Sequence, residues 1–218
     1  MAGKTLTVES VEPGHGTLKL TLNDGSVVTI GTAYLPPELP EAFFCPGAII
    51  ADEKGNALDC AAACLAAEQA ALRLVARAEQ CTAGLSRKLQ RRKHEPDAVR
   101  FVLDRLTELG LVNDARYAEL WLKPRISRGS KGPRMLLAAL QHRGIDRKTA
   151  GAAMDASLTP DAEAALLRRC LGKSANALPK TNALKREYGE QDEKRQCRMF
   201  LKAEGFSAAA IEEYEDSL

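Results

Sequence analysis

One helix–turn–helix pattern occurs three times in the chain, and this repeat constrains the fold more than any other feature of the sequence. It is marked by leucines separated by 51 and 61 residues, which are Leu89, Leu140 and Leu201. Four residues after each leucine come Lys93, Gly144 and Gly205. Glycine at this place is typical of the left-handed residue that ends a helix. The pattern predicts three equivalent turns, each joining two helices.

Cap residues and inward residues follow each turn at fixed distances. The expected N-caps are Glu95, Asp146 and Ser207, and the inward residues four positions later are Val99, Ala150 and Ile211. An earlier helix begins each copy, with expected starts or caps at Ala61, Asn113 and Thr159; in the first copy Thr82 caps the second helix and Gly110 stops the third. We therefore predict three three-helix units, residues 58–112, 113–157 and 158–218. Because each unit buries its apolar stripe partly against a neighbour, the array should be elongated and curved.

Residues 1–57 differ in character and predict a small β-rich N-terminal module. Leu18–Leu22 alternates apolar and polar residues, Asn23-Asp24-Gly25-Ser26 follows, and Val27–Ile30 resumes a β-favouring run. Asp-Gly between such runs favours a hairpin with a type I′ turn. Leu6-Thr7-Val8 is a further candidate strand. The fold class is thus mainly α with a β-rich start, and the module carries no evident chemistry.

Composition excludes several classes of protein. The hydrophobic fraction of 45% and the charged fraction of 28% are ordinary for a globular domain, not for a disordered chain. No apolar run approaches the roughly 20 residues of a membrane helix, and the start of the sequence has no secretory pattern. We therefore expect a cytoplasmic protein whose six cysteines are free thiols.

The net charge of +2 conceals a basic middle segment. Residues 1–70 hold 3 basic and 9 acidic side chains, whereas residues 71–155 hold 18 basic and 9 acidic ones. The densest run is expected on one helix face and comprises Arg87, Lys88, Arg91 and Arg92; the second unit adds Arg116, Arg125, Arg128, Lys131 and Arg134. These cations predict a polyanion or an acidic protein surface as partner, with solvated helix faces as the alternative.

Motifs of catalysis and metal binding are lacking. The sequence Gly129–Arg134 resembles a phosphate loop, but Pro133 has no N–H and a helix is expected to precede it, so Gly132-Pro133 is interpreted as a helix start where an anion could still bind. Cys60 and Cys64 are one helical turn apart, yet a structural zinc site needs four ligands. Tyr117 and Trp121 favour core packing over base stacking. We expect no enzyme activity, no metal and no cofactor.

Three segments resemble the RecX regulatory proteins in the family's order. The central signature is matched by Leu109–Ala118 and Arg125–Arg134, the first unit by Ala71–Arg77 with Leu85 and Leu89, and the last unit by Asp192–Ser207. The resemblance covers residues 65–215. It departs at His94, where the family has an apolar residue, and at Pro124, which should kink a family helix or end it early.

The resemblance implies a non-enzymatic modulator of the RecA recombinase that lies along RecA–DNA filaments and inhibits strand exchange, ATP hydrolysis and coprotease activity. The nine cations named above would then bond acidic RecA side chains or DNA phosphates, although Arg116 and Arg125 could instead brace the fold. We expect a monomer. The alternative is a protein that binds DNA directly and nonspecifically, because the helices after Asp146 and Ser207 lack the residues that read base edges.

Overall fold

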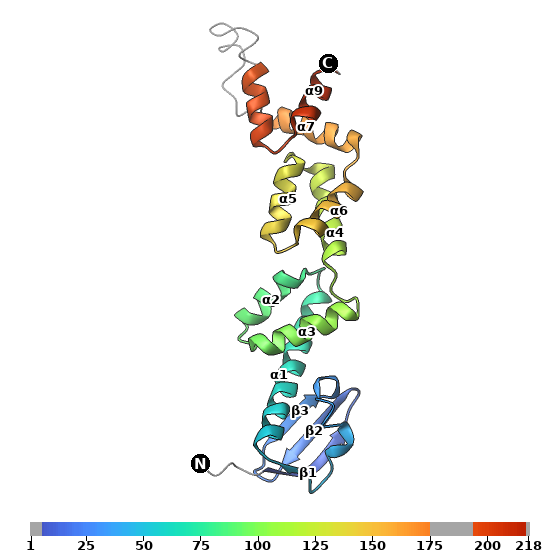
Figure 1. Cartoon of the computed structure of the whole chain (residues 1–218), viewed down its shortest axis with the longest axis vertical. Helices are drawn as coiled ribbons and strands as arrows, with labels where there is room; N and C mark the ends of the chain where they lie inside the picture. Colours follow the sequence, from blue (N-terminus) through green and yellow to red (C-terminus); the bar gives the residue numbers. More distant parts are fainter. Residues whose placement is uncertain (1–5, 175–193, 217–218) are drawn as a thin grey trace. The chain divides into compact units, whose positions relative to one another are not determined.

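The computed structural model describes residues 6–174 and 194–216, in two compact bodies, Met1–Val112 and Asn113–Leu218. Asp192, where the last family-like segment begins, lies outside the described residues. Figure 1 shows the elements in chain order, which are β1 (Leu6–Pro13), β2 (Thr17–Leu22), β3 (Val27–Gly31), η1 (Thr32–Tyr34), η2 (Glu41–Phe43), β4 (Ile49–Ile50), α1 (Asp52–Val75), α2 (Thr82–Arg91), α3 (Pro96–Glu108), α4 (Asp114–Arg128), α5 (Pro133–His142), α6 (Arg147–Ser157), α7 (Pro160–Ser174), a helix at residues 194–203, and α9 (Ala208–Asp216). The mainly helical class with a β-rich start is confirmed.

The N-terminal module is an antiparallel sheet with strand order β3-β2-β1-β4. Alternation along β2 buries Leu18, Leu20 and Leu22, as the pattern predicts. The hairpin is confirmed, but its type I′ turn is wrong, because Gly25 has a φ of 81° while Asp24 does not enter the positive region. The Gly25 N–H donates to the Leu22 carbonyl at 2.9 Å, which gives a three-residue loop in which glycine alone takes the left-handed place.

Helix α1 belongs to two cores of the first body. Leu58 and Ala61 pack with the buried strand residues, whereas Cys64 and Ala67 pack with side chains of α2 and α3. Figure 1 shows α1 running from the sheet to these helices. The helix begins at Asp52, earlier than expected, so residues 57 and 58 lie inside it. The division into four segments stays a prediction.

The three repeated turns are equivalent in detail. Lys93, Gly144 and Gly205 all have positive φ, at 65°, 98° and 96°. The residue after each donates its N–H to the carbonyl of the repeat leucine five residues before it, at distances of 3.1 to 3.3 Å, in the pairs His94–Leu89, Ile145–Leu140 and Phe206–Leu201. The three leucines are buried, as are Val99, Ala150 and Ile211. The repeat is therefore confirmed at the level of hydrogen bonds.

The N-caps agree with the sequence at most positions. Asp146 accepts from two backbone N–H groups, and the Asn113, Thr159 and Ser207 side chains accept one each. The Glu95 side chain makes no cap bond. Thr82 as a cap is wrong, because Thr82 is the first helical residue and Cys81 holds the cap position.

Pro124 lies inside α4, and the helix continues to Arg128. Of the two effects expected of Pro124, a kink or an early end of the helix, the early end is therefore wrong. Proline removes one N–H donor and crowds the preceding turn. Leu122 and Ile126 on either side are buried, however, and their burial stabilises both halves of the helix.

Candidate interaction surface

Helix α2 and the residue that ends it present three exposed arginines, Arg87, Arg91 and Arg92. The helix forms because Leu85 and Leu89 are fully buried on its other face. The Arg87 Nε–H donates to the Ala83 carbonyl at 3.2 Å, so its stem lies back along the helix while the residue stays exposed. The predicted basic face of α2 is thus present on the surface of the first body.

Lys88, the fourth cation of this run, is half-buried and forms a hydrogen bond within the fold. Its Nζ donates to Gln80 Oε1 at 2.6 Å. Gln80 is 7% exposed, and its Nε2 donates to the Ala78 carbonyl at 2.9 Å. Lys88 therefore ties α2 to the segment that follows α1, which leaves it less available to a partner than the three arginines.

The second predicted group lies in the other body, on α4 and at the start of α5. Arg116, Arg128 and Arg134 are exposed. Among the described residues, no ion pair or side-chain hydrogen bond involves the guanidinium of Arg128 or Arg134. Lys131 is 55% exposed but pairs with Glu204 at 2.7 Å. The two groups belong to different bodies, so each is a separate candidate surface.

Arg125 braces the fold. Its guanidinium carbon lies 3.7 Å from the ring centre of Trp121, and its Nη1 donates to the Trp121 carbonyl at 2.8 Å. Arg143 lies 5.0 Å from the same ring. Burial, followed by the charge of Arg143, lowers the pKa of the Arg125 guanidinium below its usual range. Trp121 is therefore covered by cations, which fits the core role expected for it rather than base stacking.

The helix start at Gly132-Pro133 is confirmed, and the alternative of an anion site there is contradicted. The Gly132 N–H donates to the Glu204 carbonyl at 2.8 Å, and the Arg134 N–H donates to the Gly205 carbonyl at 3.1 Å. These donors would otherwise attract an anion. They instead satisfy carbonyls at the end of the helix at residues 194–203, so two helices are joined end to end within the second body.

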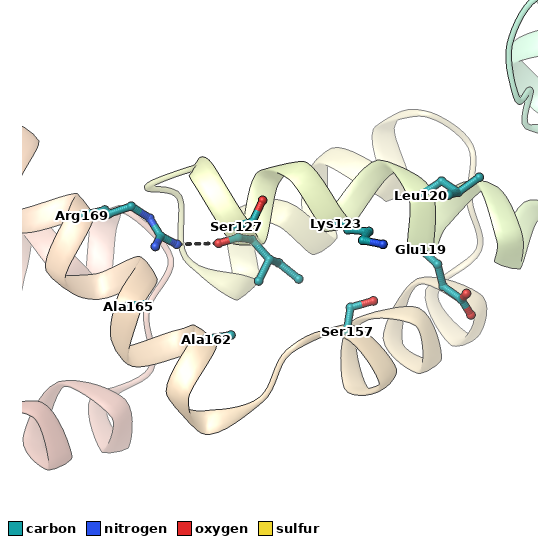
Figure 2. Close-up of a pocket in the computed structure, with 9 residues that line it drawn as sticks. Glu119, Leu120, Lys123, Ser127, Ser157, Ala162, Ala165 and Arg169 are labelled. Atoms are coloured by element: carbon teal, nitrogen blue, oxygen red, sulfur yellow. Dashed lines mark hydrogen bonds between the residues drawn. The ribbon is translucent and has the colours of Figure 1, made fainter.

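A hollow of about 560 Å³ lies between α4 and α7 in the second body (Figure 2). Figure 2 shows Glu119, Lys123 and Ser127 along α4, with Ser157 of α6 and Ala162 of α7 on the other side of the hollow. Arg169, from α7, donates to the Gly129 carbonyl at 2.8 Å and to the Ile126 carbonyl at 2.5 Å. Arg169 thus caps the end of α4, a role no local sequence pattern indicates because Arg169 is far along the chain.

The thiol pair on α1 has unequal members. Cys60 is exposed, whereas Cys64 is buried, and the two line a hollow of about 410 Å³ with Tyr34 and Phe101. Burial, helped by the adjacent Cys60, raises the pKa of the Cys64 thiol to about 12. Within residues 6–174 and 194–216, no group of three or more His, Cys, Asp or Glu is placed to hold a metal. No helix in that part of the chain is long and apolar enough to cross a bilayer.

Comparison with known proteins agrees with this architecture. The family model described as the RecX second three-helix domain matches residues 113–154, which hold α4, α5 and most of α6. The chain is similar to the RecX family. Curated relatives named regulatory protein RecX include those of Thermobifida fusca, 40% identical over 45% of this chain and 52% of the relative, and Halorhodospira halophila, 43% identical over 38% and 52%. The matched region thus spans about half the length of these RecX relatives.

Solved RecX structures share the fold. One, described as the crystal structure of regulatory protein RecX, is similar with a TM-score of 0.75 at 18% identity, over 97% of this chain and 99% of that one. Another, RecX from Lactobacillus salivarius, has a TM-score of 0.61 at 21% identity, over 72% and 96%. The RecX relatives carry the name of a regulatory protein and not of an enzyme.

Proposed function

We propose that this chain is a non-enzymatic regulator in the cytoplasm that binds RecA and RecA–DNA filaments and inhibits recombinase, ATPase and coprotease activity in DNA repair and the SOS response. The observation that carries the proposal is the match of residues 113–154 to the RecX second three-helix domain. The exposed cations of that domain and of α2 supply a surface suited to an acidic partner.

The cations most suited to this role are the exposed ones. Arg87, Arg91 and Arg92, at α2, are exposed in the first body, and Arg128 and Arg134 are exposed in the second. The same proposed set includes Lys88, Arg116, Arg125 and Lys131. Three of these side chains are engaged within the fold, by Gln80, Trp121 and Glu204 respectively for Lys88, Arg125 and Lys131. A filament repeats its binding sites, so several weak contacts along it would raise the overall affinity.

The test is RecA ATPase on single-stranded DNA, titrated with this protein beside a DNA-only binding assay over a salt series. We expect ATPase to fall at concentrations where bare DNA is not bound. Reversing charge with Arg87→Glu and Arg91→Glu together should weaken inhibition by about tenfold, since like charges across an interface cost several kcal/mol. The matched control is Arg73→Glu, which changes an exposed α1 arginine outside the proposed set.

Direct nonspecific DNA binding is the competing function. It predicts that ATPase falls only where free DNA is already coated, with a steep dependence on salt. That result would refute the filament proposal. Equal inhibition by the double variant and the control would refute the proposed role of the α2 arginines, but not the proposal that the chain binds the filament.

A further inference from the structure

The helix at residues 194–203 carries a second kind of basic surface, unrelated to the cations considered so far. Lys194 and Arg195 lie about one helical turn before Arg198, and Lys202 lies one turn after it. With Met199 these cations line an open hollow of about 510 Å³. Met199 is 64% exposed, a high value for a large apolar side chain. We name these five residues the basic methionine face.

The chain's own carboxylate already binds this face. Arg198 Nε–H donates to both oxygens of Glu215 on α9, at 2.9 Å each, and Nη2 also contacts that carboxylate. The pairing raises the pKa of the Arg198 guanidinium and lowers the pKa of the Glu215 carboxyl. Three cations, Lys194, Arg195 and Lys202, stay exposed around this pair. The basic methionine face therefore already binds one carboxylate, and its exposed cations could pair with further carboxylates.

We propose that the basic methionine face docks an acidic protein segment that carries an apolar side chain, and that Glu215 competes for Arg198 with that segment. The segment's carboxylates would pair with Arg195, Arg198 and Lys202, and its apolar side chain would cover Met199. Glu215 would act as an internal competitor that must leave Arg198 first. This inference holds whether or not the chain acts on RecA.

A protein partner fits the face better than a nucleic acid. A phosphate backbone gains nothing from an exposed thioether at the centre of the cations, whereas an apolar peptide side chain would remove Met199 from water. The carboxylates of Glu212 and Asp216 also act on Arg198 and would repel a continuous polyanion. A short peptide can place its charges away from them.

The experiment is fluorescence anisotropy of the full chain with a labelled peptide rich in glutamate and holding one central leucine. Glu215→Gln should tighten binding about two- to fivefold, the range that an exposed ion pair supports. Arg195→Glu with Lys202→Glu should weaken it by about tenfold or more. The control Arg147→Glu changes an exposed arginine of α6 and should leave binding unchanged.

Three outcomes would overturn the proposal. The first is equal affinity of the wild type and the double charge-reversal variant for the peptide. The second is equal affinity for a peptide with glutamine in place of glutamate. The third is displacement of the peptide by oligothymidine that is itself sensitive to the double variant, which would make the face a nucleic-acid surface. Circular dichroism of each variant checks that the helices are retained.

Discussion

Replacing Gly132 by alanine should destabilise the second body. A Cβ at this position would lie 2.5 Å from the Gly205 carbonyl carbon and 2.6 Å from the Phe206 nitrogen. Both atoms are backbone, so no side chain can rotate to make room. The start of α5 would have to separate from the turn that follows residue 203.

The magnitude follows from what that separation breaks. Overpacking costs about 1–3 kcal/mol, and the hydrogen bonds from Gly132 and Arg134 to that turn contribute about 1 kcal/mol each. These contributions overlap, because one movement relieves the clash and breaks the bonds. We expect a loss of about 3 kcal/mol, which lowers Tm by about 12–24 °C for a body of this size.

The assay is urea unfolding of the full chain followed by tryptophan fluorescence, because the single tryptophan, Trp121, lies in the same body. The control is Gly151→Ala on α6, where nothing lies within 4 Å of the added methyl. It should gain about 0.5–1 kcal/mol from helix propensity. If the Gly132 variant unfolds within about 0.5 kcal/mol of the wild type, the close approach of the two turns does not stabilise the body.

Three further predictions concern the turns, one cap and the thiols. Lys93→Gly should raise stability by about 0.5–1 kcal/mol in thermal unfolding, because lysine holds a left-handed φ there, and Gly144→Lys should lower it. A hydrogen bond with the Thr149 side chain, followed by those from the backbone N–H groups of Thr149 and Lys148, holds the pKa of the Asp146 carboxyl below its ordinary 3.8. The stabilisation by Asp146 is therefore complete above pH 3.8 and is lost as the pH falls through the lower folded value. The stability difference between wild type and Asp146→Ala should shrink in that range, and a constant difference would contradict the prediction. Iodoacetamide should label Cys60 rapidly and Cys64 slowly in peptide mass spectrometry, since Cys64 is buried with a pKa raised to about 12, and equal rates would refute this.

The repeat could be predicted because its determinants are local. A left-handed residue, a cap and a buried residue four positions later all lie within one short segment, so Asp146 and Ser207 fall where expected. The loop at Gly25 could not be typed in the same way, because its length and bulge depend on the strand register. The strand β4 has only two residues, so it shows no alternation of apolar and polar residues from which a strand could be predicted. It is defined by its pairing with β1.

The sequence predicts which cations belong to the candidate surface. It does not predict which of them are engaged by contacts within the fold. Lys88 is held by Gln80 and Lys131 by Glu204, and the second of these pairs joins segments far apart in the sequence. Tertiary packing determines which side chains pair with these lysines, and the spacing of residues along a helix does not predict those pairs. The basic methionine face was missed for the same reason, since its significance depends on Glu215 reaching Arg198.

Two arginines of α4 show why charge alone does not identify an interface. Arg125 and Arg128 are less than one helical turn apart, yet Arg125 stacks on Trp121 while Arg128 points to solvent. Removing Arg125 therefore exposes the indole and changes the local fold, so reduced inhibition of RecA by an Arg125 variant would not distinguish lost contact from lost structure. Arg128→Glu leaves that stack intact. A drop in inhibition with unchanged tryptophan fluorescence would place Arg128 at the interface, and unchanged inhibition would remove it from the proposed set.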